Sequence, residues 1–261
     1  MGLFLHKLNP FTEFTISQGP LYVDRLFDCL LAKEGIRDID EMNTTTRLEC
    51  YLDLLRRRIV KCTRTEYPFI QFYTAHFCQQ MADNAVKSAK QWYENALSHY
   101  QLYLGLTKGT EESRYYAQWQ TGRLQDLSHH PWAMVNESLL KANAIDPLRG
   151  ESINNIVHHY VSTGDWENAY SYSKFAKNRF YSRNPIANRR WHIDFDCYNG
   201  NLLDTHIIIC NNLAYWSEAE QVYQQLLNHV TEHIHEFQKV EKHLIQVVDQ
   251  IYHGDKLTQT Y

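Results

Sequence analysis

The sequence predicts an all-α protein in which short antiparallel helix hairpins stack side by side as a right-handed α-solenoid. Apolar residues recur at helical spacing along most of the chain, and tight turns join pairs of these segments. The 261 residues include only 10 Gly and 6 Pro, too few turn residues for a many-stranded barrel or sandwich. A hairpin this short cannot bury its own apolar face, so each one needs a neighbour of the same kind.

The clearest hairpin covers residues 151–177. Gly164-Asp165 interrupts the helical pattern and predicts a tight turn between two short helices. The apolar residues that form a stripe on each side of this turn are Ile153, Ile156, Val157 and Tyr160, then Ala169, Tyr172 and Ala176.

Residues 1–67 are expected to form an N-terminal capping segment with two helices. Residues 1–20 are irregular and punctuated by Asn9-Pro10 and Gly19-Pro20, yet rich in apolar side chains that would be costly to leave in water. We expect this stretch to fold back on the array. The two helices are predicted at about 21–33 and 44–62, where leucines recur at helical spacing.

Residues 68–230 are expected to be the repeat array, with four hairpins. The helix pairs are predicted at 69–80 with 88–104, 113–127 with 132–145, the two halves of 151–177, and 202–213 with 217–230. Gly122 is expected where two helices approach closely, and the connector at 178–200 interrupts the array.

A tryptophan follows the turn in three of these hairpins, at Trp132, Trp166 and Trp216. This recurrence at roughly 34–50 residues is typical of a solenoid. Residues 231–261 are expected to provide an amphipathic C-terminal capping helix, at about 231–252, and a tail.

The hairpins resemble tetratricopeptide repeats (TPR), most clearly in residues 151–177. A closer resemblance, over about 68–230, is to the helical-repeat tail that follows the catalytic domain in some family 2 glycosyltransferases. The segments that carry it are Phe72-Tyr73-Thr74-Ala75, Ala89-Lys90-Gln91-Trp92-Tyr93, Gly122 with Pro131-Trp132, Gly164-Asp165-Trp166-Glu167-Asn168-Ala169-Tyr170 and Leu202-Leu203-Asp204. The resemblance implies an accessory or scaffold module without its enzyme, because residues 1–67 are too few for the nucleotide-sugar domain.

Composition argues against several classes of protein. The formal net charge is -4 and the charges are scattered, which does not favour a nucleic-acid partner. No run of 18 apolar residues predicts a membrane span, and the N-terminus has no secretion or lipidation signal. The six cysteines lie far apart, so buried thiols are favoured over disulfides. We therefore expect a cytoplasmic protein.

No set of side chains forms a convincing catalytic or metal-binding constellation, so no enzyme activity and no cofactor are expected. Asp194-Phe195-Asp196 matches a pattern by which glycosyltransferases hold a divalent metal, but it lies between helices without a parallel sheet. His229 and His233 are spaced as zinc ligands on a helix, without the remaining ligands. The basic run Arg56-Arg57-Arg58 is interpreted as a solvated helix face, with a docking patch for an acidic partner as the alternative.

Binding is expected on the concave side, which the first helix of each hairpin lines. The side chains expected to face this groove are Phe72, His76, Gln79, Tyr116, Trp119, Arg123, Asn154, His158 and Asp204. Their mixture of aromatic and polar groups suits an extended peptide or a stacked sugar. The alternative is that several of them pack against neighbouring helices or the N-terminal segment.

The sequence thus favours a non-catalytic TPR-like scaffold that binds a protein or peptide partner in its concave groove. The alternative is an accessory module of glycan synthesis, associated with a family 2 glycosyltransferase or its acceptor sugar. A homo-oligomer stays open, because exposed ends of helical arrays often pair.

Overall fold

The computed structural model describes residues 20–36, 38–84, 88–106, 108–181, 193–194, 197–198 and 200–232. Within them the chain forms ten α-helices, one short 3-10 helix and no strand, which confirms the all-α prediction. The helices are α3 (Pro20–Lys33), α4 (Thr44–Ile59), α5 (Tyr67–Asn84), α6 (Ala89–Gly105), α7 (Glu111–Leu127), α8 (Trp132–Ile145), α9 (Glu151–Thr163), α10 (Trp166–Phe180), α11 (Gly200–Asn212) and α12 (Trp216–Glu232), with the 3-10 helix η1 (Ile39–Glu41) between α3 and α4. The expected N-terminal stretch 1–19 and nearly all of the expected helix 231–252 lie outside the described residues.

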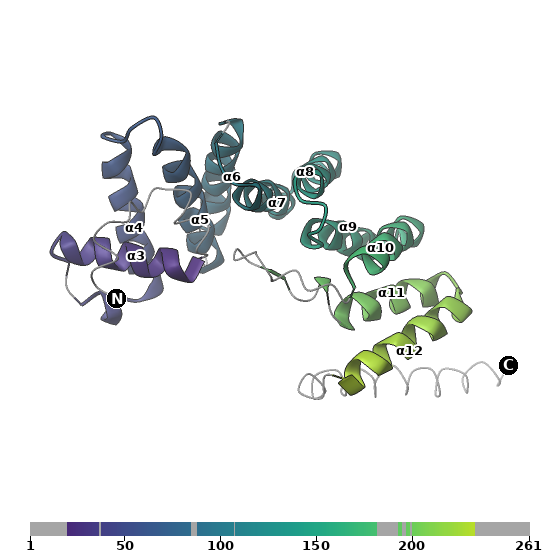
Figure 1. The fold of residues 1–261 in the computed structure, drawn as a ribbon. Coiled ribbons are helices and arrows are strands. Elements are labelled where there is room, and N and C mark those ends of the chain that lie inside the picture. The colour runs from purple at the N-terminus through teal and green to yellow at the C-terminus, as the bar shows by residue number, and fades with distance from the viewer. Residues whose placement is uncertain are drawn as a thin grey trace.

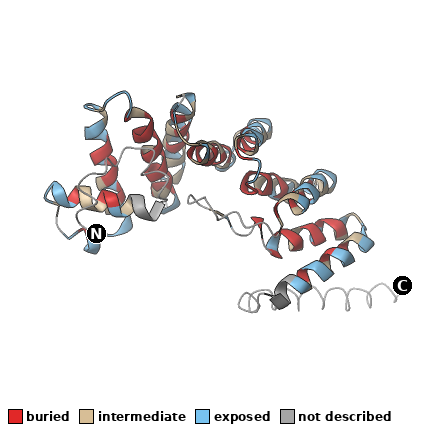
Figure 2. Ribbon diagram, in the orientation of Figure 1, coloured by how far each residue is buried: buried red, intermediate tan, exposed pale blue. Residues whose placement is uncertain are grey.

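Successive helices pack against one another in chain order and form an elongated stack that runs from α3 to α12 (Figure 1). The four predicted hairpins are present as α5–α6, α7–α8, α9–α10 and α11–α12. The second helix of each hairpin also touches the first helix of the next one. Each inner first helix is therefore covered from two sides, and the buried residues follow the faces that helices turn toward each other (Figure 2).

One hydrophobic cluster runs through most of the stack, from Phe27 of α3 to Leu202 of α11. Its aromatic members meet edge to face, as Phe72 does with Tyr100 and Tyr103 of α6. All six cysteines are free thiols; Cys78, Cys197 and Cys210 are buried as expected, whereas Cys29, Cys50 and Cys62 are half-buried. Among the described helices, none is long and apolar enough to cross a membrane.

Most helix bounds fall within three residues of their predicted positions, but α5 does not. It continues to Asn84, four residues past the predicted end, through a stretch expected to be a turn. Met81 and Ala82 explain the difference, because both are buried in the extra turn of helix. Their burial stabilises helical structure that the local sequence pattern did not indicate.

Three hairpins share one kind of turn, which brings the chain back on itself. A residue with positive φ follows the first helix in each: His129 (φ 58), Gly164 (φ 72) and Ala214 (φ 58). The next residue donates its backbone N–H to a carbonyl five positions back, as Asp165 does to Tyr160 at 2.9 Å and Tyr215 to Cys210 at 2.8 Å. This is the Schellman arrangement, which satisfies carbonyls left open at the helix end.

Gly122 of α7 lies where that helix crosses α8, as expected from the sequence. A Cβ atom at this position would lie 2.6 Å from Leu139 Cδ2 and 2.8 Å from Leu139 Cγ. Leu139 is 1% exposed and has little room to move. The absent side chain therefore sets how closely α7 and α8 approach.

A buried ion pair lies at the junction of the second and third hairpins. Arg149 and Glu151 are both fully buried, and the guanidinium donates to the carboxylate at 2.8 and 3.1 Å. Tyr115 of α7 and Tyr198 also donate to Glu151, at 3.0 and 3.1 Å. Burial works against the charge of Arg149, but the adjacent carboxylate outweighs it and raises the pKa of the guanidinium. The pair joins α7, α9 and the segment before α11.

We expect Gly122→Ala to lower the free energy of unfolding by about 1–3 kcal/mol, because the new methyl group meets Leu139. Gly105→Ala is the matched control, since a Cβ at Gly105 has no neighbour within 4 Å. Urea denaturation of both variants measures the difference. Equal effects of the two substitutions would contradict a close approach at Gly122.

We expect Glu151→Gln to lower the free energy of unfolding by about 3–5 kcal/mol, because it removes the carboxylate charge that pairs with the buried guanidinium of Arg149. Glu137→Gln is the control, since Glu137 pairs with Lys141 on an exposed face, where ion pairs contribute little to stability. Thermal and urea denaturation compare the two variants. A loss at Glu151 no larger than at Glu137 would show that the buried pair contributes little.

Candidate functional site

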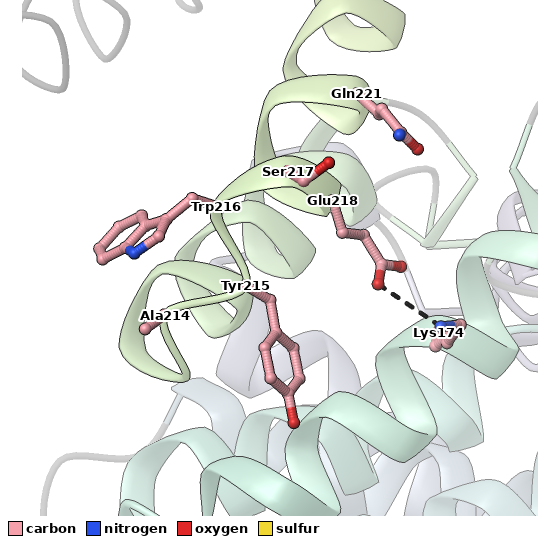
Figure 3. A pocket seen from close by; sticks show the side chains of 7 residues that line it. All are labelled: Lys174, Ala214, Tyr215, Trp216, Ser217, Glu218 and Gln221. Carbon is pink, nitrogen blue, oxygen red and sulfur yellow. Dashed lines mark hydrogen bonds and ion pairs between the residues drawn. The ribbon is translucent and has the colours of Figure 1, made fainter.

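An open pocket of about 760 Å³ lies where the fourth hairpin meets α10 (Figure 3). It is lined by Lys174 of α10, Ala214 and Tyr215 of the turn, and Trp216, Ser217, Glu218 and Gln221 of α12. The Schellman turn at Ala214 brings Tyr215 and Trp216 to the start of α12, where their side chains point in different directions and the Tyr215 ring meets Tyr170 of α10 (Figure 3). The pocket therefore combines two aromatic rings with groups of both charges.

Trp216 differs from its counterparts in the two preceding hairpins, although α8, α10 and α12 all begin with a tryptophan. Trp132 stacks on His159 of the next hairpin, with ring centroids 3.4 Å apart and planes 5° apart. Trp166 packs in a cluster that includes Ile209 and Leu213 of the next hairpin. Trp216 is 63% exposed. The tryptophan that begins the second helix is thus packed in the second and third hairpins and exposed in the fourth.

The Glu218 carboxylate forms the polar wall of the pocket. It accepts a hydrogen bond from Tyr170 at 2.6 Å, and His206 Nε2 lies 3.2 Å from its Oε1 atom. Lys174 and Lys177 of α10 reach the same carboxylate at 3.4 and 3.5 Å. Burial raises the pKa of Glu218, but the two hydrogen bonds and the two lysines outweigh it and hold the pKa at about 2. Glu218 therefore ties α12 to α10 as an anion.

His206 of α11 lies behind Glu218 and is fully buried. Its Nδ1 atom is 2.8 Å from Ser173 Oγ, and its ring stacks on Tyr170. Burial lowers the pKa of His206, which favours the neutral ring, and a neutral ring donates through only one of its two nitrogens. The network thus joins α10, α11 and α12 through side chains from all three.

His206, Cys210 and Glu218 also have the donor atoms that a zinc ion prefers, and these atoms lie within 4.8 Å of one another. Two features work against a cation. Burial raises the pKa of the Cys210 thiol to about 11, so a cation would have to displace its proton, and Lys174 and Lys177 already neutralise the carboxylate. We therefore interpret the three residues as part of the hydrogen-bonded joint.

The structure corrects the groove expectation for six of the nine residues chosen from the sequence. These six are at most 8% exposed, because the first helices are covered from two sides; they are Phe72, His76, Gln79, Tyr116, Trp119 and Asn154. Their side chains pack or hydrogen-bond inside the stack and offer no surface to a ligand. Arg123 and Asp204 are half-buried, and His158 is exposed.

Six of the nine expected groove residues, those on α5 and α7, do lie together. All of these except the half-buried Arg123 are buried inside the stack. The Tyr116 ring contacts Phe72, His76 and Trp119. Gln79 donates to Gln120 at 2.8 Å, and Arg123 donates to the same oxygen at 3.0 Å. These contacts join α5 to α7. Asn154, His158 and Asp204 lie farther along, on α9 and α11.

The other chemical candidates from the sequence do not gain a site among the described residues. Asp194 lies outside the helices, and the rest of its motif, Phe195 and Asp196, is not described. The side chain of His229 and all of His233 are likewise outside the described part of the chain. Arg57 of the basic run pairs with Glu34 and Asp53, and Arg58 pairs with Glu66.

Sequence reasoning missed Lys174, Tyr215 and Glu218. One signal was available, because Trp216 repeats the position of Trp132 and Trp166. Nothing local indicated Glu218, whose partner Tyr170 is 48 positions away.

Comparison with protein-family models found no matching family, and comparison with curated proteins found no matching sequence.

We expect Glu218→Gln to destabilise the protein at neutral pH by on the order of 1 kcal/mol, since the site is open to solvent. The folded pKa, about 2, lies below the ordinary value of 4.5. The stabilisation by Glu218 is therefore present above about pH 5 and is lost as pH falls toward 2. Denaturation of the wild type and of Glu218→Gln between pH 2 and 7 measures this difference in stability. His206 and the two lysines are present in both proteins, so their own titration affects both.

Glu220→Gln is the control for the change in net charge, because Glu220 is an exposed residue of the same helix. A stability difference between wild type and Glu218→Gln that stays constant over this pH range would contradict the assigned role of the carboxylate.

Proposed function

We propose that this chain is a non-catalytic scaffold, a right-handed stack of TPR-like hairpins with capping segments at both ends, and that it binds a protein or peptide partner. An all-helical stack of successive hairpins supports the proposal, because such arrays present extended surfaces to partners. The resemblance to a helical-repeat tail without its catalytic domain supports it as well.

The observation that carries the proposal is the exposure of Trp216. In the two preceding hairpins this tryptophan is half-buried: Trp132 meets His159 and Tyr160 of α9, and Trp166 packs against a cluster that includes Ile209 of α11. A partner helix with an aromatic or branched apolar pair would satisfy the same position in the fourth hairpin. Tryptophan is also the residue type most enriched among the dominant contacts of protein interfaces. The proposed binding surface is therefore the Trp216 pocket, in place of the six buried groove residues.

The test is affinity capture from the native host with the wild-type chain, followed by calorimetry on the purified partner. We expect Trp216→Ala to weaken binding at least about 30-fold, the effect of losing a dominant interface contact. Leu102→Ala is the control, because Leu102 is 51% exposed on α6, away from the pocket. Equal affinity of wild type and Trp216→Ala for the purified partner would refute the assigned surface.

Stability measurements on the same variants distinguish a partner site from internal packing. We expect Trp216→Ala to change the free energy of unfolding by less than about 0.5 kcal/mol, as for an exposed residue. Trp132→Ala should lower it by about 3 kcal/mol, because its ring is stacked on His159. A similar loss in both variants would mean that Trp216 is covered by this chain itself.

The second candidate is an accessory module of glycan synthesis that holds a family 2 glycosyltransferase or its acceptor sugar. The observation that favours it is the pair of exposed rings, Tyr215 and Trp216, beside the polar groups of Ser217 and Gln221. Saccharide rings stack on such aromatic faces while polar side chains bind their hydroxyls. Titration with oligosaccharides, with Trp216→Ala as the negative control, separates this candidate from the first. Trp119 is unsuitable for this test because it is 5% exposed.

A further inference from the structure

A second pocket, of about 750 Å³, lies in the N-terminal half of the described stack, where α4 ends and α5 begins. The end of α6 closes its remaining side. Its lining divides into an apolar part and a polar part. The apolar part is Ile59, Cys62, Tyr67, Pro68 and Leu106, and the polar part is Thr63, Arg64, Thr65 and Lys108. The volume is in the range of small-molecule sites, which are mostly apolar with a few polar groups that fix orientation.

The charge of this pocket has one sign. Arg64 and Lys108 are exposed cations, and no carboxylate is among the lining residues. The nearest acid in sequence, Glu66, is 7% exposed and already bound. It accepts from Arg58 at 2.7 Å and from the backbone and hydroxyl of Thr63 at 2.9 and 3.0 Å. Within the described residues, no ion pair joins Arg64 or Lys108 to a carboxylate.

Helix-end electrostatics do not explain these two cations. Basic residues are common in the last turn of a helix, where they offset its dipole, and Arg56, Arg57 and Arg58 occupy that turn in α4. Arg64 and Lys108 lie beyond the ends of α4 and α6. Residues 56–64 include five cations and no acid, in a chain whose net charge is -4. Of these five cations only Arg64 lines the pocket, where it is joined by Lys108.

We propose that this pocket binds a phosphate monoester carried on a ring or a short apolar group. A phosphate monoester is close to a dianion at neutral pH and has three strong acceptor oxygens. Its charge balances the two cations, and its oxygens accept hydrogen bonds from them. Ile59, Pro68 and Leu106 provide the apolar surface for the group that carries the phosphate. The site is separate from the Trp216 pocket and does not rest on the scaffold proposal.

The test is titration of the full chain with phenyl phosphate, followed by calorimetry and by amide chemical shifts. We expect a dissociation constant on the order of 1 mM for so small a ligand. Arg64→Gln and Lys108→Gln should each weaken binding about tenfold, the effect of losing one charge-assisted contact. Both residues are exposed, so neither substitution removes a buried contact. Lys90→Gln is the matched control, because Lys90 is an exposed cation of α6 outside the pocket.

The comparison ligands separate the parts of the proposal. Inorganic phosphate should bind more weakly than phenyl phosphate because it leaves the apolar wall unused, and benzoate more weakly because it has one charge. Phenol should not bind. The proposal is overturned if phenyl phosphate does not bind at millimolar concentration, or if inorganic phosphate binds equally well. It is also overturned if Lys90→Gln weakens binding as much as the pocket variants do.

Discussion

The arrangement of the stack depends on the buried pair of Arg149 and Glu151. Removing two charges from water costs several kcal/mol for each ion, so this pair is tolerated only where hydrogen bonds compensate it. Here two tyrosine hydroxyls complete the shell of the carboxylate, one from α7 and one from the segment that precedes α11. A shift in the packing of these elements would leave a charge buried without partners. We infer that the pair fixes how the second and third hairpins meet.

The fold could be predicted from sequence because its signals are local. The bounds of α8 agree with the expected ones, and α9 begins at the expected residue and ends at the expected turn. At α9, Gly150 precedes the first helical residue and Gly164 supplies the positive φ that ends the helix. The end of α5 could not be found in this way, since Met81 and Ala82 remain helical through contacts with other parts of the chain.

The site could be predicted much less well, because exposure depends on neighbours that the sequence does not name. Trp119 and Tyr116 have the residue types of a binding groove, yet α7 is covered from two sides and both are buried. The opposite holds for Trp216, which was not among the residues expected to bind and whose ring is exposed. The Glu218 joint combines residues from three helices, and no spacing rule connects them.

The division of the core has a consequence for how the protein opens. The large cluster ends at Leu202, whereas Val222 and Leu226 of α12 belong to a small separate cluster with Leu203 and Ile207. In a linear array each unit is held by its neighbours, so a hairpin such as α11–α12, whose apolar residues form a small separate cluster, unfolds locally at a lower free energy than the helices of the large cluster. Its amide protons then exchange faster than those of α5 or α7. Any molecule that occupies this hairpin slows that exchange, because it binds the closed form alone.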